Sequence, residues 1–134
     1  MRQIKFQIYW IAGHEMLYDK NNDLEFRDNE NYPITYLSDA TNHPESYKVR
    51  QYTGLKDKNG TEIYDGDYIR YSTRTINGSI YTHVCRVFQH ESGTWRIEGY
   101  HEDNHSYETK GTVYAVHLIC EVIGNIYENP ELVK

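Results

Sequence analysis

Alternation of apolar and polar residues is the dominant pattern along the chain, and it predicts strands rather than helices. No segment keeps the 3.6-residue apolar spacing of an amphipathic helix, and the tail around Pro130 allows one helical turn at most. The fold is therefore expected to be mainly β. The predicted strands cover residues 2–11, 16–18, 24–26, 32–37, 47–53, 55–58, 61–64, 68–76, 79–90, 94–100, 112–118 and 119–127.

Two Asn-Gly pairs interrupt this alternation, Asn59-Gly60 and Asn77-Gly78, and each lies between two predicted strands. Such pairs favour type I′ hairpins, in which both central residues take a positive φ. The segment 101–111 is polar, without periodicity and too long for a hairpin tip, which predicts a functional or mobile loop.

Strand spacing predicts the architecture of the second half of the chain. Five or six short strands follow residue 50, with turns every eight to twelve residues, which favours a small closed barrel without exposed edges. The segment 65–69, Asp-Gly-Asp-Tyr-Ile, resembles the turn into a strand of many SH3-like barrels. We therefore expect an N-terminal strand-rich segment or lobe over 1–46 and an SH3-like β-barrel over 47–134, with a linker at 38–46. A single continuous domain is the alternative.

The cysteines, the tyrosines and the N-terminal segment indicate the state of the thiols, the kind of strand and the location of the protein. The two cysteines, Cys85 and Cys120, have no metal-ligand spacing and are expected to be reduced, buried thiols. Fourteen tyrosines suit half-buried strands, because the ring packs while the hydroxyl stays in water. Polar residues interrupt the N-terminal apolar positions, so no signal peptide or membrane span is expected, and a cytoplasmic protein without a membrane partner is predicted.

Catalytic signatures such as a phosphate loop, a nucleophile elbow or a zinc motif do not occur in the sequence. We therefore predict no enzyme, no catalytic residues and no cofactor. The run 101–105, His-Glu-Asp-Asn-His, is the best candidate for metal ligands, but a loop does not align its side chains in advance. It is interpreted as a solvated polar loop, and no metal is expected.

Positive charge gathers in the centre of an acidic chain. The net charge is −6, whereas residues 70–97 hold four arginines against one glutamate, or +3. Arg70 and Arg74 share a face by strand alternation. Together with aromatic side chains, this face resembles the surfaces that small barrels offer to single-stranded nucleic acid. The candidate binding residues are Arg70, Tyr71, Arg74, Arg86, Trp95 and Arg96.

Both this face and the first hairpin have a purely structural alternative. The arginines could form an ordinary exposed face, paired with acids from elsewhere, while Trp95 belongs to the core. Similarly, Lys56, Asp57 and Lys58 could form an exposed contact tip, or the hairpin around them could serve only to build the turn.

Three segments carry a family resemblance. The chain is similar to the YopX family at its opening, Arg2-x-Ile4-Lys5-Phe6 and Met16-Leu17-Tyr18, and above all in QYTGLKDKNGTEIYDGDYI (51–69) and EVIGNIYENPEL (121–132). The resemblance implies an SH3-type barrel encoded by a phage or prophage and acting in the cytoplasm of its bacterial host. It implies no settled biochemical activity and adds nothing about residues 70–118.

Two functions are therefore considered. The first is a non-catalytic accessory module that binds a host or phage protein, or a second copy of itself in a homo-oligomer. The alternative is a nucleic-acid-binding barrel that uses the arginine face. Salt separates the two, because phosphate contacts weaken steeply as ionic strength rises and a mostly apolar protein interface does not.

Overall fold

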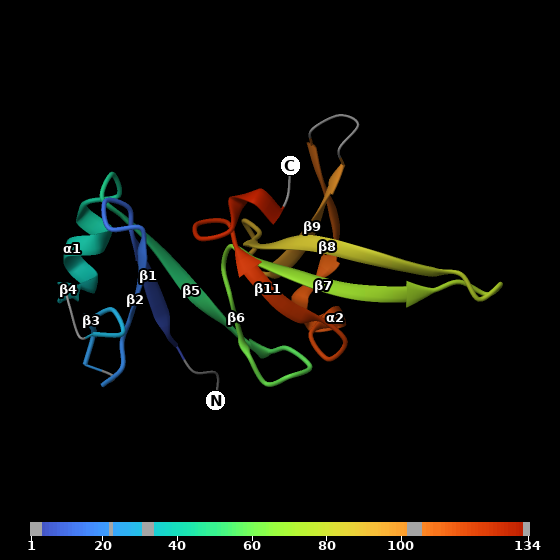
Figure 1. The fold of residues 1–134 in the computed structure, drawn as a ribbon, viewed down its shortest axis with the longest axis horizontal. Helices are drawn as coiled ribbons and strands as arrows, with labels where there is room; N and C mark the ends of the chain where they lie inside the picture. The colour runs from blue at the N-terminus through green and yellow to red at the C-terminus, as the bar shows by residue number, and fades with distance from the viewer. Residues whose placement is uncertain (1–3, 22, 31–33, 102–105, 133–134) are drawn as a thin grey trace. The chain divides into compact units, whose positions relative to one another are not determined.

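The computed structural model describes residues 4–21, 23–30, 34–101 and 106–132. It confirms a mainly β fold (Figure 1). The strands are β1 (Phe6–Trp10), β2 (Glu15–Tyr18), β3 (Glu25–Phe26), β4 (Thr35–Tyr36), β5 (Tyr47–Lys56), β6 (Glu62–Tyr64), β7 (Asp67–Arg74), β8 (Ile80–Gln89), β9 (Trp95–His101), β10 (Ser106–Thr112) and β11 (Glu121–Asn125). The helices are α1 (Leu37–Asn42), α2 (Val113–Val116) and the short 3-10 helix η1 (Pro130–Leu132).

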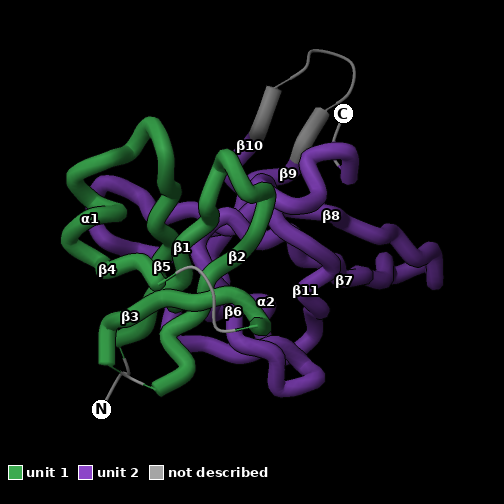
Figure 2. The backbone as a smooth tube through the Cα atoms, turned by 60° about the vertical axis from the view of Figure 1, so that its left-hand side comes forward, with its two compact units in different colours: residues 1–52 green, residues 53–134 purple. Residues whose placement is uncertain are grey.

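The chain divides into two compact units, Met1–Tyr52 and Thr53–Lys134 (Figure 2). The division falls within β5, whereas the sequence placed a boundary between residues 46 and 47. The first part of β5 pairs with β1, and the strand order β2-β1-β5-β6 makes β6 its other neighbour. One continuous strand thus contributes to both units.

Unit 1 is built on β1, which lies between β2 and β5 with antiparallel pairing on both sides. Ile8, Leu17, Phe26 and Ala40 form its buried core. The helix α1 occupies most of the predicted linker 38–46, so the expectation of a loop there is wrong. Leu37 and Ala40 stand three residues apart, on one side of the helix, and both pack into this core.

Unit 2 is built on a five-stranded antiparallel sheet in the order β10-β9-β8-β7-β11. One face of this sheet carries the core, which includes Ile69, Val87 and Ile97. Ile63 from β6 and Val113 from α2 join the same cluster. This arrangement is compatible with an SH3-like barrel, and that finer topology stays a prediction.

Two segments of unit 2 differ from the predicted pattern. The range 112–118 was predicted as a strand, but it contains α2, whose first turn is capped when Thr112 Oγ1 accepts the N–H of Ala115 (3.2 Å). The predicted loop 101–111 is largely strand, because β10 covers Ser106–Thr112 and pairs with β9. Residues 102–105 lie outside the described residues.

Both predicted Asn-Gly hairpins are present, but their turn type is not I′. Gly60 and Gly78 have φ of +84° and +88°, while neither preceding asparagine is among the described residues with positive φ. The N–H of each glycine instead donates to a carbonyl three residues earlier, Asp57 O and Thr75 O, both at 3.0 Å. This geometry belongs to a three-residue loop, a type I turn closed by a glycine in the left-handed region.

Candidate functional site

Strand register places all four candidate arginines on one face of the unit 2 sheet. Residues paired across neighbouring strands share a face, and alternate residues of one strand do so too. Arg86 pairs with Tyr68 on β7 and with Glu98 on β9, while Phe88, two residues further, pairs with Arg96. Arg70 and Arg74 follow Tyr68 at even spacing. We call this surface the arginine face.

Acidic residues neutralise part of the arginine face. Arg70 Nε donates to Glu121 Oε1 at 3.0 Å, and Arg86 Nε donates to Glu98 Oε2 at 3.1 Å. The Arg70 guanidinium lowers the pKa of Glu121, mainly through this hydrogen bond. Arg96 Nε is buried without a hydrogen-bond partner, so it is not displayed to a ligand. Two of the four guanidinium groups are thus engaged by carboxylates.

The two candidate aromatic residues do not lie on the arginine face. Tyr71 pairs with His83, and Trp95 pairs with Gln89, which places both on the opposite side of the sheet. There they belong to the core of unit 2, with 9% and 8% of their surface exposed. The expectation that Tyr71 and Trp95 add a stacking surface beside the arginines is therefore corrected.

Both thiols are part of the same core. Cys85 and Cys120 are buried and not disulfide-bonded. Burial raises the pKa of Cys85, and it raises that of Cys120 from 9.0 to about 11. Burial likewise raises the pKa of Tyr71 to about 12, with the neighbouring Cys85 adding to the effect. Because the thiolate is the reactive form, neither cysteine is suited to act as a nucleophile near neutral pH.

We expect thiol labelling at pH 8 to be at least about 100-fold slower in the native protein than in guanidinium, because both sulfurs are buried and protonated. Native labelling at the rate of a free cysteine would contradict this assignment.

The raised pKa of Cys120 also makes the stability of the fold depend on pH. The folded state keeps a proton that the unfolded chain releases above pH 9.0. The stability that this thiol contributes is therefore fully present below pH 9.0 and is lost as the pH rises through about 11.

The hairpin between β5 and β6 is anchored, not a free tip. Asp57 is buried, and its Oδ1 accepts the N–H groups of Asn59 (2.8 Å) and Thr61 (2.9 Å). Its Oδ2 accepts the N–H of Val122 on β11 at 2.9 Å. The carboxylate therefore ties the hairpin to the sheet and is unavailable to a partner, whereas Lys58 remains exposed.

The outer part of the hairpin formed by β7 and β8 is exposed to solvent. β11 pairs with β7 only as far as Arg70, and β9 pairs with β8 only from Cys85 onward. Between these points β7 and β8 pair with each other alone, and residues 72–82 are exposed throughout (Figure 1). We call residues 72–82 the arm. It presents three large exposed apolar side chains, Ile76, Ile80 and Tyr81.

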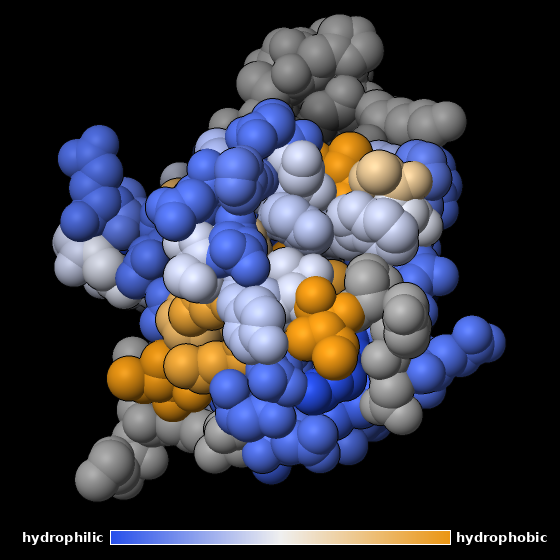
Figure 3. All heavy atoms as spheres, turned by 90° about the vertical axis from the view of Figure 1, so that its left-hand side faces the viewer, coloured by the Kyte–Doolittle hydropathy of each residue, from blue (hydrophilic) through white to orange (hydrophobic). Residues whose placement is uncertain are grey.

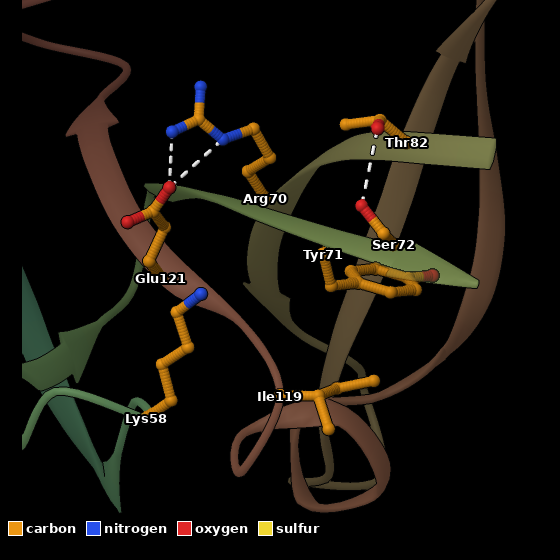
Figure 4. A pocket seen from close by; sticks show the side chains of 7 residues that line it. All are labelled: Lys58, Arg70, Tyr71, Ser72, Thr82, Ile119 and Glu121. Atoms are coloured by element: carbon orange, nitrogen blue, oxygen red, sulfur yellow. Dashed lines mark hydrogen bonds and ion pairs between the residues drawn. The ribbon is translucent and has the colours of Figure 1, made fainter. Parts of the chain in front are cut away.

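A cavity of about 460 Å³ opens at the base of the arm (Figure 4). Arg70 and Glu121 lie on one side of it, joined by their hydrogen bonds, and the Lys58 side chain reaches toward them. The Tyr71 ring and Ile119 form an apolar wall, and Ser72 and Thr82 complete the lining. A site with both cationic and apolar walls can hold an extended chain that carries both kinds of side chain.

One face of the molecule is mainly hydrophilic, with hydrophobic residues in small groups (Figure 3). Among the described residues, no three His, Cys, Asp or Glu side chains gather as a metal site. Most of the histidine run 101–105 lies outside the described residues. In the described ranges, no helix has the length and apolar character to cross a membrane.

Comparisons with known proteins identify the family of the chain and a similar solved structure. A family model described as YopX protein matches residues 5–134, so the chain belongs to the YopX family, as its motifs indicated. Among solved structures, it is similar to the crystal structure of protein EF1440 from Enterococcus faecalis. The sequence identity is 25%, the TM-score is 0.60, and the match covers 100% of each chain. A comparison with curated proteins finds no match.

Proposed function

We propose that this YopX-family protein is a non-catalytic accessory module that binds a partner protein through the arm. We further propose that it is encoded by a phage or prophage and acts in the cytoplasm of the bacterial host. The observation that carries the proposal is the exposure of Ile76, Ile80 and Tyr81 on a two-stranded arm that nothing else in the described chain covers.

Energetics support a docking role for the arm. A two-stranded hairpin without a third strand or a packed face is only marginally stable in water. Apolar side chains on such an element are unfavourable while water surrounds them. Burying one of them against a partner contributes about 1.5–3 kcal/mol to the free energy of binding. A partner that covers the arm therefore gains apolar contact and stabilises the arm at the same time.

The proposal that the module is non-catalytic is supported by the chemistry of its nucleophiles. The two thiols are buried with raised pKa values, and the carboxylate of Asp57 is fully used by backbone N–H groups. The exposed side chains of the arm are apolar groups, hydroxyls, the Asn77 amide and the Arg74 guanidinium, which suit contact rather than bond making.

The test is capture of partners from host lysate with a matched pair of variants. Ile76→Ser with Ile80→Ser removes apolar surface from the arm, and Tyr114→Ser with Leu118→Ser removes a similar exposed surface around α2. We expect the arm variant to bind the protein that the wild type captures at least about 100-fold more weakly, because it lacks two apolar side chains that the partner would bury. The α2 variant should retain that protein at the wild-type level.

Nuclease treatment provides the deciding control. The captured protein should still be retained after nuclease treatment. It should differ from the bait, unless the arm joins two copies of this chain. Equal retention by both variants, or partners that disappear with nuclease, would overturn the proposal.

Nucleic-acid binding is the second candidate, and one observation favours it. The register gathers Arg70, Arg74, Arg86 and Arg96 on one face of the sheet. Carboxylates engage two of them, however, and the core holds the aromatic residues that would stack on bases. If this function holds, Arg70→Ala with Arg74→Ala will weaken binding to single-stranded DNA and flatten its salt dependence.

A further inference from the structure

The outer edge of β7 is open along the base of the arm. The pairing of β7 with β11 ends at Arg70 and Glu121, where the chain leaves the sheet toward Cys120 and α2. From Tyr71 to Arg74, no described strand pairs with the edge of β7 that faces away from β8. An open edge of this kind presents backbone donors and acceptors to any extended chain that reaches it.

Two residues direct their backbone groups toward this open edge. Thr75 donates its N–H to Ser79 O across the hairpin at 2.8 Å, so Thr75 faces β8. Successive residues of an antiparallel strand face opposite edges, and the register from Tyr68 to Arg74 runs without a shift. Ser72 and Arg74 therefore point their N–H and C=O groups away from β8.

The cavity flanks this edge with a different chemistry on each face of the sheet (Figure 4). Arg70 and Ser72 lie on the arginine face, whereas the Tyr71 ring lies on the other face beside Ile119. A strand added along β7 would place its side chains on the two faces in turn. Its acidic side chains would meet the cations, and its apolar side chains would meet Tyr71 and Ile119.

Charge favours an acidic strand over a second copy of this chain. Arg74 forms no salt bridge among the described residues, and Arg70 binds only one of the two carboxylate oxygens of Glu121. Lys58 also lowers the pKa of Glu121, so two cations share this one carboxylate. If two copies joined through this edge, Arg74 and Arg70 of one would face the same cations of the other. Like charges placed opposite each other across a strand pair are destabilising.

We infer that the open edge of β7 at Ser72–Arg74, with its adjoining cavity, binds an extended segment of a partner protein as an added strand. The segment carries acidic and apolar side chains in alternation. The backbone of Ser72 and Arg74 provides affinity, and Lys58, Arg70, Tyr71 and Ile119 select the side chains. This inference rests on the proposed function and specifies how the arm holds its partner.

The test uses a fluorescent ten-residue peptide of alternating Glu and Val, and a matched peptide with Lys in place of Glu. Binding to the full chain is measured by fluorescence anisotropy, and the site is located from amide chemical shifts. We expect the Glu-Val peptide to bind and to shift the amides of Ser72 and Arg74. Ser72→Pro removes an outward N–H and should abolish binding, while Ser72→Ala should retain it.

Charge reversal keeps the test valid if the proline variant does not fold. Lys58→Glu with Arg74→Glu should weaken the Glu-Val peptide at least about tenfold and make the Lys-Val peptide the better ligand. Absence of Glu-Val binding, equal affinity for both peptides, or preference for an oligothymidylate would overturn the inference. If the peptides fail in this way but the wild type still captures a protein that the arm variant loses, the inference is wrong and the proposed function stands. Failure of the inference can therefore be distinguished from failure of the proposed function.

Discussion

Replacing Asp57 with alanine is expected to lower the free energy of unfolding by about 3 kcal/mol. The carboxylate accepts three backbone N–H groups, from Asn59, Thr61 and Val122, and it does so in a buried position. Each hydrogen bond to a charged group contributes about 1.5–3 kcal/mol, and water can replace part of the loss at the hairpin. Chemical denaturation followed by circular dichroism measures the change.

Two controls separate the role of Asp57 from that of hairpin loops in general. Asp57→Asn keeps one acceptor oxygen and should cost less, about 1–2 kcal/mol. The second control is Glu91→Ala in the loop between β8 and β9. That loop has the same two backbone hydrogen bonds as the Asp57 hairpin, from His90 N to Thr94 O and from Gly93 N to His90 O, but the side chain of Glu91 is exposed. This substitution should change stability by less than about 0.5 kcal/mol. Equal effects of Asp57→Ala and Glu91→Ala would contradict the anchoring role.

Replacing Ile97 with alanine is expected to cost about 3–4 kcal/mol. Ile97 lies on the central part of β9 and is fully buried among Val87, Trp95 and other members of the unit 2 core. Removing a buried isoleucine side chain loses its transfer free energy and leaves a cavity, which together typically cost 2–5 kcal/mol. Thermal or urea unfolding measures the loss.

The arm provides the matched control for this substitution. Ile76 is the same residue type in the same unit, but its exposure is 109% of the reference value. Ile76→Ala should therefore shift stability by less than about 0.5 kcal/mol. Comparable destabilisation by Ile76→Ala and Ile97→Ala would mean that the arm is already packed against something in the free protein.

Alternation and turn residues predicted β7, β8 and β9 well, because much of each strand has one buried and one exposed face, whereas β10 was predicted as a loop. The two short helices were missed for a physical reason. α1 has six residues and α2 has four, which is less than two helical turns, so no periodicity develops. The Asn-Gly pairs located the hairpins but not their type, since glycine in the left-handed region serves both kinds of turn.

The candidate site was only partly predictable. Alternation correctly grouped Arg70 with Arg74, and the same rule places Tyr71 and Trp95 on the opposite side from their neighbouring arginines. The pairing of Arg70 with Glu121 spans 51 positions and depends on which strand lies beside β7. The exposure of the arm likewise depends on where β9 and β11 stop pairing, which no local pattern specifies.

Photo-crosslinking from the arm tests the central claim most directly. A benzoylphenylalanine at position 80 reports what touches the arm in living cells, and the same residue at position 114 serves as the matched exposed control. The account predicts a discrete protein adduct from position 80 that is absent from position 114 and resists nuclease. No adduct from position 80, or an adduct that nuclease removes, would contradict it.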